Sequence, residues 1–262
     1  MIALVDGMAA HASTGGVALR GTDPVVLLIH GAGMDSTVWQ LQTRYLAHRG
    51  FRAVAVDLPG HGKSNGTALG DVASMAGWIA RFIDAVGLGA VHVVGHSMGS
   101  FIALELASRH PDLVRSICLL GTTTSMPVHP DLLASASVDL PHAAALMAAW
   151  GHAQPAHVGP NPTPGLWMLG GARALVENST PGVLATDLHA CAAYDNALVA
   201  AASVACPATV VIGLGDKMTP PKGGRALAAA LGHGQVTELA DTGHSMMTEN
   251  PRAVRRSIVA AI

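Results

Sequence analysis

The sequence predicts an α/β fold: a doubly wound, mostly parallel sheet with a helical cap insertion. Three observations support this prediction. Short apolar segments alternate with longer segments of helical character, as in sheets that helices cover on both faces. The alternation stops after residue 125 and resumes near residue 195. The length of 262 residues suits one large domain better than two.

Five short segments have the composition of buried strands. Each is apolar and rich in β-branched residues, without the polar alternation of a half-exposed strand, which favours a parallel sheet covered on both faces. They span residues 25–30, 52–57, 91–96, 116–121 and 208–213. A sixth segment, residues 235–240, mixes polar and apolar residues and is a candidate edge strand.

Helices are expected between these strands. The helix that follows Ser97 is apolar nearly all round and stops before Pro111, so it should be buried under the sheet. A last helix begins at Pro251, because proline is tolerated in a first helical turn. The other helices are expected near residues 36–48, 72–86 and 220–231.

After residue 125 the pattern changes. Helical segments begin at Pro130, Pro141 and Pro181, each suited to a first turn, and no strand signal occurs among them. Residues 151–165 have the glycine and proline content of an irregular loop. A helical insertion beside a sheet should lie over its edge as a cap. The predicted division is a core of residues 1–125 and 195–262 and a helical cap of residues 126–194.

Composition narrows the possible partners. The net charge is −2 and only 12% of residues are charged, so no basic surface for nucleic acid is expected. No apolar run approaches the roughly 18 residues needed to cross a bilayer, and no basic segment of a secretory signal begins the chain. We therefore expect a cytoplasmic protein. The three cysteines do not suggest a disulfide framework, and Cys118 is expected in the core.

Ser97 lies in a Gly-His-Ser-Met-Gly motif between an expected strand and an expected helix. The glycines of a Gly-x-Ser-x-Gly turn permit a sharp backbone that leaves the serine hydroxyl projecting above the sheet. A serine nucleophile also needs a base, usually histidine, and a group that orients this base. Ser97 is therefore a candidate nucleophile, and its partners should lie at other strand ends.

Asp216 and His244 are the candidate partners. Asp216 follows the strand 208–213, at the sheet edge where active-site groups gather, although Gly-Asp is also ordinary turn chemistry. His244 follows the candidate last strand, which gives the chain order Ser, Asp, His that this fold requires. For the backbone donors of an oxyanion hole, the sequence offers Ala32 and Met98, with Gly33 as the alternative to Ala32.

These segments together resemble the α/β-hydrolase superfamily in its small, capped form. The resemblance covers nearly the whole chain and rests on LLIHGAG, VAVDLPGHGKS, VVGHSMGS, VVIGLGDKMTP and DTGHSMMTENP, in family order and at family-like spacing. It implies a Ser97–Asp216–His244 triad, an oxyanion hole from Ala32 and Met98, and no cofactor. Ser100 departs from the second glycine that many relatives carry after the turn, a change that affects helix packing rather than the triad.

Other segments resemble known phosphate-binding or metal-binding motifs but do not match them. The segment GHGKS lacks the first glycine of a phosphate-binding loop, because Asp57 occupies that position. His142, His152 and His157 have no acidic or cysteine partners at ligand spacing, so no metal site is expected. His96 points away from its neighbour Ser97 along a strand and is expected to pack or shape the site. Asp57 is expected to be structural.

The expected reaction is hydrolysis of a carboxylic ester through an acyl-enzyme, with a small-molecule ester or lactone as substrate. The layout also occurs in carbon–carbon bond hydrolases, enol-lactonases and cofactor-free perhydrolases, and in ligand receptors with a slow triad. These alternatives and the oligomeric state stay open. Four cap residues are candidates for the substrate pocket, with packing of the cap onto the sheet as the other interpretation. They are Met147, Trp150, Trp167 and Met168.

Overall fold

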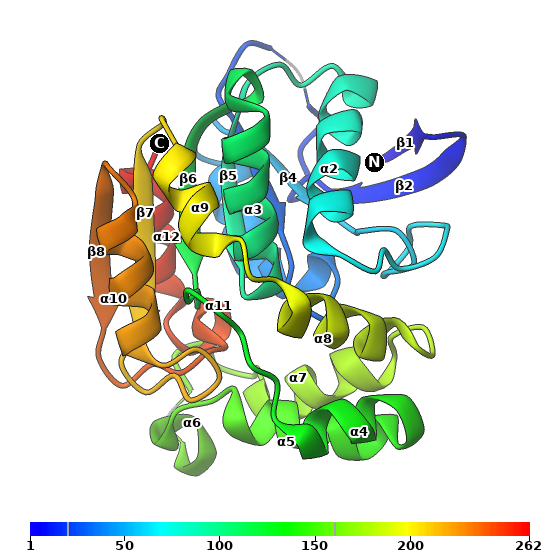
Figure 1. Cartoon of the computed structure of the whole chain (residues 1–262), viewed down its shortest axis with the longest axis vertical. Coiled ribbons are helices and arrows are strands. Elements are labelled where there is room, and N and C mark those ends of the chain that lie inside the picture. Colours follow the sequence, from blue (N-terminus) through cyan, green and yellow to red (C-terminus); the bar gives the residue numbers. More distant parts are fainter. Residues whose placement is uncertain (20, 160) are drawn as a thin grey trace.

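The computed structural model describes residues 1–19, 21–159 and 161–262, and a single eight-stranded sheet lies at its centre (Figure 1). The strand order is β1-β2-β4-β3-β5-β6-β7-β8. The strands are β1 (Ile2–Val5), β2 (Met8–Ser13), β3 (Val25–Ile29), β4 (Arg52–Val56), β5 (Val91–His96), β6 (Val114–Leu120), β7 (Ala208–Gly213) and β8 (Gly234–Leu239). All neighbouring pairs from β4 to β8 are parallel, which confirms the predicted sheet.

Helices cover both faces of the sheet because successive side chains of each buried strand point to opposite sides. Val26 and Leu28 of β3 pack in a cluster with side chains of α1 and α12. Leu27 and Ile29 belong to a second cluster, with side chains of α2, α3 and α10. These helices are α1 (Gln40–Ala47), α2 (Val72–Val86), α3 (Met98–Arg109), α10 (Pro221–Ala230) and α12 (Pro251–Ala260).

The first two strands were not expected from the sequence. β1 and β2 form an antiparallel hairpin, and β2 pairs antiparallel with β4 at this edge of the sheet. Asp6 and Gly7 form the two-residue turn with positive φ values of 53° and 78°. An Asp-Gly pair is a strong hairpin signal, but the flanking strands are short and rich in alanine, so their apolar pattern is weak. The expected edge strand, β8, does lie at the opposite edge.

Helices α4 to α8 lie between β6 and β7 in the sequence and along one end of the sheet in space (Figure 1). We refer to residues 126–194 as the helical insertion. Their described part contains no strand, as expected, but α6 and α7 lie where no helix was predicted. The insertion consists of α4 (Pro130–Val138), α5 (Leu140–Trp150), α6 (Gln154–Val158), α7 (Met168–Glu177) and α8 (Val183–Ala193).

Four shorter helices complete the architecture. They are η1 (Ser36–Trp39), which precedes α1; η2 (Pro111–Leu113); α9 (Ala197–Ser203), which packs on α3; and α11 (Met246–Glu249). The expected helix at 36–48 is therefore divided into a 3₁₀ turn and an α-helix. None of the helices in the described ranges is both long and apolar enough to cross a bilayer.

Candidate active site

The turn that carries Ser97 is strained and tightly packed. Ser97 has φ 54° and ψ −120°, a conformation that side-chain-bearing residues rarely adopt. A Cβ atom on Gly95 would collide with the carbonyl of Gly99, and one on Gly99 would collide with the carbonyl of Ile29. Both glycines are therefore required by close backbone approach, as the motif predicts. Ser100 donates its hydroxyl to the Ser97 carbonyl at 2.6 Å, which fixes the start of α3.

His244 and Asp216 form a buried pair at the ends of neighbouring strands. The His244 Nδ1–H donates to Asp216 Oδ2 at 2.8 Å, and the exposed fractions of the two residues are 3% and 4%. The backbone amides of Met218 and Thr219 donate to Asp216 Oδ1, and the Thr219 hydroxyl donates to Oδ2. These bonds orient the carboxylate and leave His244 Nε2 as the ring nitrogen free to act on a substrate.

Asp216 is held in its ionised form. Burial by itself would raise the pKa of this carboxyl group. The charge of His244 and the hydrogen bonds from His244 and Thr219 act in the opposite direction and prevail, so the pKa of Asp216 lies below its ordinary value. The carboxylate can therefore fix one tautomer of His244 and stabilise its protonated form.

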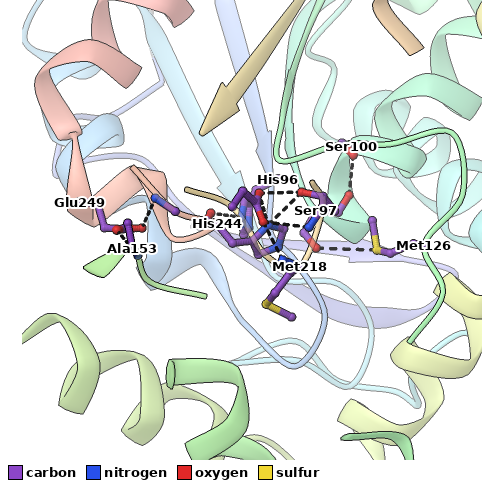
Figure 2. Close-up of polar contacts among 11 residues, drawn as sticks. His96, Ser97, Ser100, Met126, Ala153, Met218, His244 and Glu249 are labelled. Atoms are coloured by element: carbon purple, nitrogen blue, oxygen red, sulfur yellow. Dashed lines mark hydrogen bonds and ion pairs between the residues drawn. The ribbon is translucent and has the colours of Figure 1, made fainter. Parts of the chain in front are cut away.

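The loop that carries His244 is anchored on both sides (Figure 2). The His96 Nε2–H donates to the His244 carbonyl at 2.9 Å. Glu249 accepts bonds from the amides of Gly243 and Ala153, which ties the loop to the helical insertion. Burial and the neighbouring His244 lower the pKa of His96 to about 3, so His96 is neutral at ordinary pH. The structure thus gives His96 the shaping role that the sequence suggested.

Ser97 and His244 line the same cavity, which has a volume of about 560 Å³. The Ser97 hydroxyl lies 4.0 Å from the Met126 sulfur (Figure 2). Among the described contacts, it makes no hydrogen bond to His244. Ligand-free sites often have such loose contacts between nucleophile and base, and a serine side chain can rotate among its staggered positions. Ser97 and His244 therefore line one cavity, with no hydrogen bond between them among the described contacts.

The amides of Ala32 and Met98 remain free. Ala32 lines the cavity beside Ser97, and Met98 is the first residue of α3. Within the described residues neither amide has an acceptor. By contrast, the Gly33 amide donates to Asp187 Oδ2 at 2.8 Å. Of the two candidates on the first loop, the geometry therefore favours Ala32 over Gly33 as an oxyanion donor.

The structure separates the four candidate pocket residues into two pairs. Met147 and Trp150 line the cavity that contains Ser97 and His244. Trp167 and Met168 instead line an adjoining cavity of about 250 Å³. Trp167, the residue that precedes the first turn of α7, is 79% exposed. The remaining apolar walls of the main cavity come largely from the insertion, at Met126, Leu132, Val176 and Leu188.

Sequence reasoning missed the residues that hold the site in place. Thr219 orients Asp216 from three residues away, a spacing typical of aspartate turns and therefore recognisable in principle. Glu249 also binds the amide of Ala153, 96 residues away, and Asp187 binds that of Gly33, 154 residues away. Asp57 is structural as expected, since it accepts bonds from the amides of Ser36 and Lys63.

His61 and Asp187 form a second buried pair, between the DLPGHGKS segment and α8. The His61 Nε2–H donates to Asp187 Oδ2 at 2.8 Å, and the side chains are 1% and 0% exposed. Burial opposes the charged form of His61, but the bond and charge of Asp187 prevail and raise the pKa of His61. Asp57 acts in the same direction, and the ring of His30 lies 4.8 Å away.

This pair should make stability depend on pH. Folding raises the pKa of His61, so its protonation stabilises the folded state. This contribution to the free energy of unfolding is complete below the ordinary histidine pKa of about 6.5. It is lost as the pH rises through the raised pKa. We expect His61→Ala to lower the free energy of unfolding by about 3 kcal/mol at pH 6, as when one partner of a buried pair is removed. Urea unfolding of wild type and His61→Ala at pH 6 and pH 9 measures this loss. The difference in free energy of unfolding between the two proteins should be smaller at pH 9. An equal or larger difference at pH 9 would contradict this role of the pair.

Comparison with known proteins places the fold among hydrolases. A model described as the alpha/beta hydrolase family matches residues 26–257. The enol-lactonase from Burkholderia xenovorans LB400 has a similar structure, with a TM-score of 0.88 and 24% identity over 99% of this chain and 98% of that one. At this level of identity the likeness concerns the fold.

Two curated relatives match over a shorter region. The dihydrolipoyllysine-residue acetyltransferase component of the acetoin cleaving system of Cupriavidus necator is 45% identical over 102 residues, which are 38% of this chain and 27% of that protein. The (E)-2-((N-methylformamido)methylene)succinate hydrolase of Acinetobacter baylyi is 33% identical over 103 residues, 39% of each chain. The matched region thus spans well under half of either relative.

Proposed function

We propose that this chain, which belongs to the α/β hydrolase family, cleaves carboxylic esters through an acyl-serine intermediate. One observation carries the proposal. His244, which is hydrogen-bonded to the buried Asp216, and Ser97 on its strained turn line the same cavity. Each group comes from a different strand end, and together they supply the nucleophile, the base and the orienting acid that ester hydrolysis needs.

In the proposed mechanism, Ser97 Oγ attacks the ester carbonyl while His244 Nε2 takes the hydroxyl proton. A tetrahedral intermediate forms, and His244 returns this proton to the leaving alcohol as the acyl–oxygen bond breaks. A water molecule then gives a proton to His244 as its oxygen attacks the acyl-serine. When this second tetrahedral intermediate breaks down, His244 returns the proton to Ser97 Oγ and the acid is released. Asp216 keeps the proton of neutral His244 on Nδ1 and stabilises the imidazolium that forms twice in the cycle.

Ala32 and Met98 are the proposed oxyanion donors. Their amides have no acceptor among the described residues, and Ala32 borders the cavity next to Ser97. Donors that are already in place stabilise the charge that develops on the carbonyl oxygen without reorganising. The start of α3 adds a favourable helix dipole at the same point.

The helical insertion is the proposed cap of the site, with residues 1–125 and 195–262 as the core. Side chains of the insertion form most of the apolar wall of the cavity, and Lys217 is the one charged side chain among its described lining residues. Such a lining favours an ester with an apolar acyl or alcohol group over a charged one. Lactones are the alternative substrates, because opening of the lactone ring uses the same steps.

The test is a panel of esters, lactones and diketones, with active sites counted by covalent labelling. Steady turnover of many ester molecules per labelled site supports the proposal. Preference for the diketones would instead indicate a carbon–carbon bond hydrolase. A single stoichiometric burst followed by arrest would indicate a ligand receptor with a slow triad.

The apolar cavity also predicts a preference for acyl length. Butyryl esters should have a higher kcat/KM than acetyl esters, by about fourfold for each methylene that is fully buried. We expect Leu132→Trp to reverse this order, because a larger side chain would occupy the space that the longer acyl group needs. The assay uses acetyl, butyryl and octanoyl esters of one chromogenic alcohol. Equal kcat/KM values for all three would contradict an apolar acyl pocket.

A further inference from the structure

The first loop of the site, residues 30–34, is held by a side chain of the helical insertion. The Gly33 amide donates to Asp187 Oδ2 at 2.8 Å, and Asp187 lies on α8, 154 residues further along the chain. Leu184, one helical turn before Asp187, packs against Gly33 so closely that a Cβ atom on this glycine would lie 2.7 Å from its side chain. The loop therefore takes its position from α8 as well as from β3.

Asp187 is itself fixed by a charged partner. The same Oδ2 atom accepts the His61 Nε2–H at 2.8 Å, while the His61 Nδ1–H donates to the Pro59 carbonyl at 3.0 Å. Carboxylate and carbonyl oxygens accept hydrogen bonds, so the doubly protonated form of His61 satisfies both contacts, and the bond to Asp187 raises the pKa of His61 accordingly. A buried, charge-assisted bond of this kind is strong and directional. Two hydrogen bonds to Oδ2 therefore hold the carboxylate beside Gly33, while its Oδ1 has no partner among the described residues.

This tether bears directly on Ala32. The bond between Gly33 and Asp187 fixes the peptide that follows Ala32. On the other side, Gly31 packs so closely against Ser97 that a Cβ atom on this glycine would lie 3.2 Å from the Ser97 Cβ. Ala32, between these two contacts, lines the cavity, and its amide has no acceptor among the described residues. Small displacements of an oxyanion donor reduce its effect strongly, because stabilisation depends on its distance from the developing charge.

We propose that Asp187 is a positioning residue, through which the helical insertion sets the oxyanion donor Ala32. The inference rests on the ester hydrolysis proposed above. Asp187 does not line the main cavity, so it acts through the Gly33 amide rather than on the substrate. Replacing Asp187 should therefore destabilise the transition state, in which the oxyanion develops, and hardly change substrate binding.

The test compares wild type, Asp187→Ala and Asp187→Asn with a chromogenic butyryl ester, with kcat expressed per site labelled by a fluorophosphonate. Asp187→Ala should lower kcat by about 10- to 100-fold, a part of the loss seen when an oxyanion donor is removed, and change KM by less than about threefold. The inhibition constant of a trifluoromethyl ketone, which forms an oxyanion at the site, should rise by the same factor as kcat/KM falls. Asp187→Asn should restore most of kcat, because its amide oxygen can still accept the Gly33 bond.

Val183→Ala is the matched control, since Val183 is a buried residue of α8 that does not line the cavity. It should lower the melting temperature and leave kcat per labelled site unchanged. If Asp187→Ala also changes only the melting temperature, or if Asp187→Asn is no more active than Asp187→Ala, the positioning role is wrong while the ester hydrolase stands. Failure of the wild type to be labelled at Ser97 would overturn both.

Discussion

Ser97→Ala should abolish ester hydrolysis almost completely, with kcat reduced by about 10⁶-fold, as when the nucleophile of a serine triad is removed. The reason is that Ser97 is the proposed attacking group: it shares its cavity with His244 and Ala32, and Met98 follows it at the start of α3. A small residual rate should persist, because binding and the oxyanion donors still act without the nucleophile. The measurement is the initial rate of hydrolysis of a chromogenic butyryl ester.

The control for this variant is Ser125→Ala, which removes an exposed serine from the segment after β6 and should leave kcat unchanged. Stability gives a second, independent readout. Ser97 has a positive φ, so Ser97→Gly should be as inactive as Ser97→Ala and yet raise the free energy of unfolding by about 1 kcal/mol. An active Ser97→Ala enzyme would contradict the nucleophile assignment. An inactive and destabilised Ser97→Gly would contradict the strained turn.

Asp216→Asn should reduce kcat by about 10⁴-fold while the fold is preserved. The asparagine amide would donate to His244 Nδ1 and so place the ring proton on Nε2, where it blocks the uptake of the proton from Ser97. The loss should appear in kcat more than in KM, because Asp216 lies behind His244 and does not border the cavity. The measurement is a steady-state rate profile for wild type and variant with one ester.

Asp241→Asn is the matched control, because Asp241 is an exposed acid on the loop that carries His244. Its φ of 51° is one that asparagine adopts readily, so the exchange should change neither stability nor kcat. Equal losses of kcat in Asp216→Asn and Asp241→Asn would show that disturbance of the loop, rather than a changed orientation of His244, causes the loss. Wild-type kcat in Asp216→Asn would contradict the role of the buried pair.

The sheet and the positions of the main site residues could be predicted because they depend on local patterns. Strands β3 to β7 are continuous apolar segments. Ser97 directly follows β5, and Asp216 and His244 lie on the short loops after β7 and β8. In a parallel sheet this alone brings them to one edge. The hairpin of β1 and β2 was missed because its apolar pattern is weak, although its Asp-Gly turn was visible in the sequence.

The supporting contacts could not be predicted from the sequence. The pairing of Asp187 with Gly33 and His61 depends on where α8 lies, and no local signal relates these residues. The prediction of which residues line the substrate pocket also depends on how the helices pack, which the sequence does not reveal. Met147 and Trp150 face the main cavity and Trp167 does not, because helix orientation within the insertion decides which apolar side chains point inward.

The most direct test of the central claim is to locate the residue that a fluorophosphonate labels, by mass spectrometry of the digested protein. We expect one label per chain, on Ser97, formed as the serine oxygen displaces fluoride from phosphorus. His244→Ala should slow this labelling by several orders of magnitude, because the base is lost. Rapid labelling of a different serine, or labelling of Ser97 at the wild-type rate in His244→Ala, would contradict the claim that these two residues act together.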